Sequence, residues 1–168
     1  MNVSRTPTAP PSFWKPLAVA AGLALAIGAA GGLLTRLDAW YYALRVPPWK
    51  PPDLAFGPAW TTIFALCAVA AALAWRARPE AAFRRRLLLA FGVNAALNVL
   101  WSALFFFLRR PDWASSEVVL LWGSIVWVMV VLQNASRLAA LLLLPYLAWV
   151  TLAAALTWEI ARLNGPFG

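Results

Sequence analysis

Residues 138–160 read LAALLLLPYLAWVTLAAALTWEI. The only charged residue in this stretch of 23 is Glu159, which stands at its end. A helix that crosses a membrane needs roughly 20 mostly apolar residues, because each residue advances it by about 1.5 Å through a hydrocarbon core about 30 Å thick. The stretch is therefore long enough and apolar enough to be a membrane-spanning helix.

Four further stretches have the same character, namely residues 17–34, 56–75, 87–108 and 114–132. The first also resembles a cleavable signal peptide, but it exceeds the apolar region of about 7–15 residues that such peptides carry, so we count it as a span. None of the five stretches alternates polar and apolar residues as a barrel strand does. We therefore predict an all-α integral membrane protein, a bundle of five transmembrane helices in one domain over residues 1–168.

The composition excludes several classes of protein. Apolar residues make up 63% of the chain and charged residues 12%, and the mean hydropathy is +0.73. In soluble domains, apolar residues average about 45–50% and charged residues about 25%. The chain has no His and a single cysteine, Cys67, which removes imidazole acid–base chemistry, the usual zinc and haem ligands and an internal disulfide. We accordingly expect no metal site and no cofactor.

The net charge of +8 comes from 14 basic residues that lie between the apolar stretches rather than in one patch. Membrane lipid headgroups are therefore the expected partner of these charges, and nucleic acid is not. Eight of the basic residues fall on the amino-terminal side of the five spans and six on the other, which favours a cytoplasmic amino terminus.

The connection Thr35–Ala55 differs from the other connections because it is long, aromatic and rich in proline. Prolines at 47, 48, 51 and 52 fix the backbone and remove amide donors, so residues 47–52 cannot form a regular helix. Because bare backbone cannot face lipid, the segment must lie at the membrane interface or fold over the bundle. A lid over the bundle and an interfacial anchor are the two alternatives.

Helical spacing places polar and aromatic residues on one face of two spans. The face of the third span carries Asn94, Asn98, Trp101 and Phe105, and that of the fifth carries Tyr146, Trp149, Ala153 and Leu156. If the two faces meet, they enclose a mostly apolar cleft with a few directed amides, as a ligand site requires. The alternative is that the asparagines hydrogen-bond between helices and the tryptophans only pack.

Several strings in the chain resemble the translocator protein family, whose bacterial members are called tryptophan-rich sensory proteins (TspO/MBR). They are Trp40-Tyr41 with Pro47, Trp49 and Pro51-Pro52; Phe56-Gly57-Pro58-Ala59-Trp60-Thr61; Leu97-Asn98-Val99-Leu100-Trp101-Ser102; and Pro145-Tyr146-Leu147-Ala148-Trp149-Val150. The resemblance implies a five-helix bundle with a cavity that opens toward the first loop, binding of porphyrins such as protoporphyrin IX, and homodimers. Its implied ligand-binding residues are Tyr41, Trp49, Trp60, Asn98, Trp113, Trp149 and Ala153.

The function that follows from the resemblance is that of a receptor-like protein in a bacterial membrane, which binds tetrapyrroles or other flat apolar ligands and regulates porphyrin metabolism or a stress response. An alternative is an enzyme that degrades porphyrin with light and oxygen, in which Trp60 and Trp149 would be the catalytic residues. A third hypothesis is a porphyrin or sterol transporter. Sterol binding is disfavoured, because Trp158 stands before Arg162 where the sterol pattern has a Tyr.

Overall fold

The structure, a computed structural model, describes residues 12–167 and contains five long helical spans. They are α1 (Trp14–Leu34), α3 (Phe56–Ala77), α4 (Ala81–Ser102) continued by η2 (Ala103–Phe107), α5 (Pro111–Gln133), and α6 (Arg137–Leu141) followed by α7 (Leu144–Asn164). All five are long and apolar enough to cross a membrane, and the described residues contain no strand. The predicted five-helix membrane bundle is therefore confirmed.

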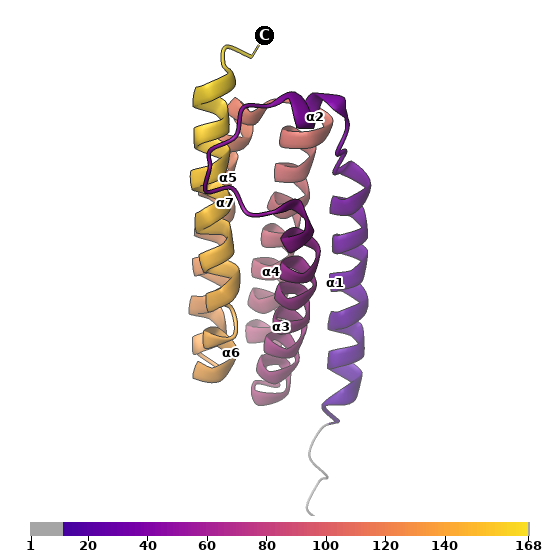
Figure 1. Ribbon diagram of the computed structural model, residues 1–168. Coiled ribbons are helices and arrows are strands. Elements are labelled where there is room, and N and C mark those ends of the chain that lie inside the picture. The colour runs from indigo at the N-terminus through magenta and orange to yellow at the C-terminus, as the bar shows by residue number, and fades with distance from the viewer. Residues whose placement is uncertain (1–11, 168) are drawn as a thin grey trace, which may run out of the picture.

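The spans stand side by side as a bundle, which Figure 1 shows with α1 at one edge and α7 at the other. Helix α1 packs mainly on α3 and more lightly on α4, α4 packs on α5, and α5 packs on α7. Helix α5 carries the most buried residues, whereas α1 has none. Helix α5 is therefore enclosed by its neighbours, whereas α1 stands at the edge of the bundle and is exposed along its length.

The third span begins at Ala81, six residues before the predicted start at residue 87. The prediction treated the run Arg84–Arg86 as a loop, but these arginines lie within the first turns of α4. Long basic side chains can lie along apolar surface while their charged ends reach water. Arg84 differs in that its guanidinium lies against Trp75, 4.4 Å from the ring centroid, and donates to the carbonyl oxygen of that residue.

The same span ends in a π-helical turn, η2. The amide of Leu108 donates to the carbonyl oxygen of Ala103 five residues earlier (2.8 Å), and Arg109 then takes a left-handed conformation (φ 55°) that ends the helix. A π turn holds one residue more than an α turn. It places Phe105 in the core, where its ring stacks on Trp101 at 5.4 Å.

The fifth span is two helices rather than the single helix predicted over residues 138–160. Helix α6 ends at Leu141, and α7 begins at Leu144 with Pro145 in its first turn. Inside a helix, Pro145 would remove a hydrogen bond and clash with the carbonyl of Leu141 four residues earlier. The interruption places the proline where a helix tolerates it.

The first loop is ordered. It contains α2 (Ala39–Ala43), η1 (Asp53–Ala55) and, between them, the non-helical residues 44–52, which we call the strap. Figure 1 shows the strap running from α2 across to α7 and back to the start of α3. This path confirms that residues 47–52 are not helical and that the loop folds over one end of the bundle.

Candidate functional site

A chain of hydrogen bonds crosses the middle of the bundle between α4, α5 and α7. Asn98 Nδ2 donates to Tyr146 Oη, and the Tyr146 hydroxyl donates to Asn94 Oδ1, both at 3.3 Å. Asn94 Nδ2 donates to Ser124 Oγ (2.9 Å), which donates to the carbonyl oxygen of Leu121 (2.7 Å). Buried polar groups need such partners, because hydrocarbon supplies none. The two polar faces predicted from helical spacing therefore meet, and they do so at Tyr146.

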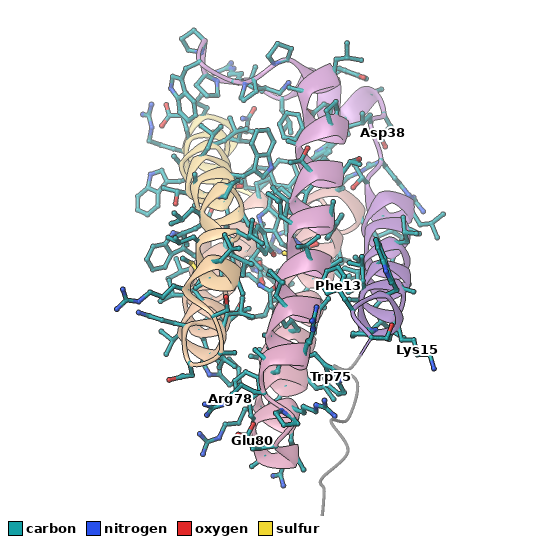
Figure 2. All side chains as sticks on the ribbon, turned by 90° about the horizontal axis from the view of Figure 1, so that it is seen from below. Phe13, Lys15, Asp38, Trp75, Arg78 and Glu80 are labelled. Carbon is teal, nitrogen blue, oxygen red and sulfur yellow. The ribbon has the colours of Figure 1, made fainter. Side chains whose placement is uncertain are left out.

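A cavity of about 610 Å³, which we call the slot, opens between α1, α3 and α4. Lys15 and Trp75 flank one end, and Asn98 and Tyr146 line the other. Figure 2 shows Lys15, at the start of α1, on the same side as Trp75, near the end of α3. Because Lys15 begins α1 and the strap follows its end, the slot opens at the end of the bundle opposite the strap. Of the seven predicted ligand-binding residues, only Asn98 lines it.

The two tryptophans predicted to hold a flat ligand, Trp60 on α3 and Trp149 on α7, are partly buried and pack against one buried cluster. The ring of Trp149 meets that of Phe56 edge-on at 5.4 Å. Trp60 stacks on Phe64 at 5.5 Å and meets Tyr146 edge-on at 6.0 Å. Since Phe64 and Tyr146 both line the slot, Trp60 lies directly behind the slot wall. The structure thus brings both indoles to the same cluster, and their contact with a ligand stays a prediction.

The strap is fastened at two points. The hydroxyl of Tyr41 donates to Asp53 Oδ1 (2.7 Å), which also accepts from Lys50 Nζ. At the end of α7, Asn164 accepts from the backbone amide of Arg45 and donates to its carbonyl oxygen, both at 2.8 Å. Burial and the hydrogen bond to Asp53 raise the pKa of Tyr41, so the donor stays protonated. Tyr41, predicted to contact ligand, holds the strap in this structure.

The remaining predicted residues are spread over the strap, α5 and α7. Trp49 and Trp113 are about half exposed and belong to none of the buried clusters of the described residues. The guanidinium of Arg110 lies 4.1 Å from the ring centroid of Trp113, which occupies that face of the indole. Ala153 lies one helical turn after Trp149 and is partly buried. Ala153 thus follows Trp149 on α7, but the alanine that packs on the buried cluster of Trp60 and Trp149 is its neighbour, Ala154.

Glu117 is a polar residue that the sequence reasoning missed, because it lies close to the beginning of its span. It is only 6% exposed, and neither carboxyl oxygen has a hydrogen-bond partner among the described residues. The indole Nε1 of Trp101 is also buried without a partner there. A carboxyl group inside a membrane bundle is costly and usually functional. Glu117 lies four residues before Leu121 and seven before Ser124, both on the buried face of α5, and this helical spacing was the signal that could have revealed it.

Acidic side chains outside this interior are dispersed and paired with bases. Asp38 accepts from Arg109 at 2.8 Å, and Asp112 accepts from Arg110. The pKa of Asp38 is lowered, chiefly by the backbone amide of Tyr41. Across residues 12–167 no group of three or more His, Cys, Asp or Glu side chains is placed to hold a metal ion. The polar groups of the interior include the amides of Asn94 and Asn98, the hydroxyls of Tyr146 and Ser124, and the carboxyl of Glu117.

Comparison with known proteins gives a consistent result. The sequence model of the TspO/MBR family matches residues 20–163. A tryptophan-rich protein TspO of Chlorobaculum tepidum is 38% identical over 154 residues, which cover 88% of this chain and 95% of that protein. Protein CrtK of Rhodobacter capsulatus is 34% identical over 142 residues, which cover 84% of this chain and 89% of CrtK. The translocator protein of Sus scrofa is 33% identical over 93% of both chains.

Proposed function

The chain belongs to the TspO/MBR family of integral multi-pass membrane proteins, and from this premise we propose that it is a receptor that binds tetrapyrroles of the protoporphyrin IX type. The family supports a receptor or sensory role in the membrane, and relatives are named as sensory and translocator proteins. The tetrapyrrole as ligand is what the resemblance to this family implies, and the aromatic side chains described below support it.

The observation that carries the proposal is the pair of indoles on α3 and α7, of which Trp149 meets Phe56, a ring that also lies 6.0 Å from Lys50 of the strap. Trp60 and Trp149 come from different helices, adjoin the same buried cluster and pack edge-on or stacked against other rings. Contacts of this kind are worth about 0.5–1.5 kcal/mol each beyond the area they bury. A flat macrocycle that enters beneath the strap would replace the contacts of the two indoles with neighbouring rings. The indoles would then stack on the faces of the macrocycle, so its entry removes little aromatic stabilisation.

The strap also offers a cation for the carboxylates of such a ligand. Lys50 is already engaged by Asp53. Arg45 is exposed and forms no ion pair within the described part of the chain, while Asn164 holds its backbone in place. A guanidinium can bind a carboxylate through two parallel hydrogen bonds. Arg45 is therefore the group we assign to a propionate.

The test is titration of the purified full chain in detergent with protoporphyrin IX, followed by quenching of tryptophan fluorescence. We expect the double variant Trp60→Phe, Trp149→Phe to weaken binding by about tenfold, the equivalent of about 1.4 kcal/mol, because stacking area and two indole N–H groups are lost. Trp158→Phe is the matched control, since Trp158 is on α7 but faces outward and is 67% exposed. Equal affinity in the double variant and the control would contradict the assignment of the site.

A further inference from the structure

The open end of the slot, beside Lys15, lies at the other end from the wall that Trp60 adjoins, and nothing in the proposed function uses it. We propose that the slot is a lipid site, which holds one acyl chain of an anionic membrane phospholipid with the phosphate beside Lys15. The proposal rests on the dimensions of the slot, on its walls and on the charges at its mouth, and it does not depend on tetrapyrrole binding.

The slot has the length of one leaflet of a membrane. Its lining residues on α1 run from Lys15 to Ile27, and those on α4 run from Leu87 to Asn98. At about 1.5 Å per residue these intervals are about 18 Å and about 16 Å. Half of a hydrocarbon core about 30 Å thick is about 15 Å. A lipid whose headgroup lies at the interface by Lys15 would thus reach Asn98 with the end of its chain.

The walls of the slot suit an alkyl chain. Small side chains from three helices line it, with Ala24 on α1, Ala71 on α3, and Gly92 and Ala95 on α4. They leave room that larger residues would fill, and α1, which has no buried residue, does not close the gap. An opening of this size in contact with lipid gains dispersion contacts when a hydrocarbon chain fills it. The membrane supplies that chain at high concentration.

The mouth of the slot is basic. Lys15 is exposed and has no acidic partner within residues 12–167. Beside it, Trp75 carries Arg84 on its ring, and Arg84 Nη2 donates to the carbonyl oxygen of Trp75 (3.2 Å). Arg84 Nε is buried and makes no hydrogen bond to the described residues. Two cations at interface depth favour an anionic headgroup over a headgroup without net charge.

The experiment is native mass spectrometry of the purified full chain after incubation with equal amounts of palmitoyl-oleoyl phosphatidylglycerol and phosphatidylcholine. Ala95→Phe places a ring in the slot, and Ala96→Phe makes the same change one residue along α4, at an exposed position outside the lining. Lys15→Gln removes the charge at the mouth, and Arg76→Gln removes one at the same end of the bundle outside the lining.

We expect one tightly retained phosphatidylglycerol in the parent chain, its loss in Ala95→Phe, and its retention in Ala96→Phe. Lys15→Gln should lower the preference for phosphatidylglycerol over phosphatidylcholine about fivefold, which corresponds to about 1 kcal/mol per basic residue near a membrane surface. Arg76→Gln should leave more of that preference than Lys15→Gln does. The comparison of Lys15→Gln with Arg76→Gln keeps the test valid if Ala95→Phe does not fold.

Three results would overturn the proposal. The first is equal lipid retention in Ala95→Phe and Ala96→Phe, and the second is equal headgroup preference in Lys15→Gln and Arg76→Gln. The third is displacement of the phospholipid by free palmitate at equal concentration, which would assign the slot to fatty acids. A fourth result concerns both proposals. If protoporphyrin IX no longer quenches tryptophan fluorescence in Ala95→Phe but still does so in the double tryptophan variant, the tetrapyrrole binds in the slot. That result would contradict both proposals.

Discussion

Tyr146→Phe tests whether the hydrogen-bond chain across the bundle contributes to its stability. The substitution keeps the ring, so it leaves no cavity, and removes only the hydroxyl that joins Asn98 Nδ2 to Asn94 Oδ1. Hydrogen bonds between membrane helices average about 0.6 kcal/mol each, so two give about 1.2 kcal/mol. Both distances are 3.3 Å, longer than the usual 2.9–3.0 Å, which keeps the contribution near this average. We therefore expect a loss of about 1 kcal/mol in the free energy of unfolding.

The assay is unfolding of the detergent-solubilised protein by a denaturing detergent, followed by circular dichroism. Tyr42→Phe is the matched control, because Tyr42 is 65% exposed and its hydroxyl makes no hydrogen bond to the described residues. A surface change of this kind usually stays within about 0.5 kcal/mol. If Tyr146→Phe is no more destabilising than Tyr42→Phe, the chain of hydrogen bonds carries no stability. A loss well above about 3 kcal/mol would mean that the amides left behind, rather than the lost bonds, dominate.

Two further substitutions probe the strap and the wall of the slot. Asn164→Ala removes both hydrogen bonds from α7 to the strap. We expect faster proteolysis and faster amide exchange within residues 44–52, while the helices keep their protection. Unchanged rates in the strap would show that Asn164 does not fasten it. Gly28→Ala places a Cβ 3.1 Å from the ring of Phe64, which stacks on Trp60. We therefore expect a shift in the wavelength of tryptophan emission, and we expect no such shift when Trp60 is also replaced by Phe. Gly22→Ala, where no atom lies within 4 Å of the new Cβ, should leave the emission unchanged, and an equal shift in both variants would contradict the predicted contact.

The sequence was sufficient for the number of spans, the non-helical loop and the residues on the two polar faces, whereas the meeting of these faces was left open. These features depend on local properties: the length of an apolar run, the backbone of proline, and the spacing of Asn94 and Asn98 along one helix. The boundary at Ala81 was missed, because charge alone was taken to end a helix whereas Arg84 lies on Trp75. Pro145 was visible, but the prediction counted it inside a span.

The slot could not be predicted from the chain. Its shape depends on how closely α1 approaches α4, and the evenly apolar surface of α1 gives no periodic pattern that would fix this distance. The burial of Glu117 depends in the same way on the tight packing around α5. Sequence patterns assign a residue to a helix face, whereas the width of the space before that face is decided by the neighbouring helices.

The π turn at residues 103–107 has a consequence for any variant that changes the length of the chain. Each residue of an α-helix turns the following backbone by about 100°. Deleting one residue between Ala103 and Phe107 would convert the wide turn to an ordinary one and turn Leu108 and Arg109, whose left-handed conformation ends the helix, to a different side of α4. Single-residue deletions here should therefore be far less tolerated than substitutions, although the segment ends at a loop.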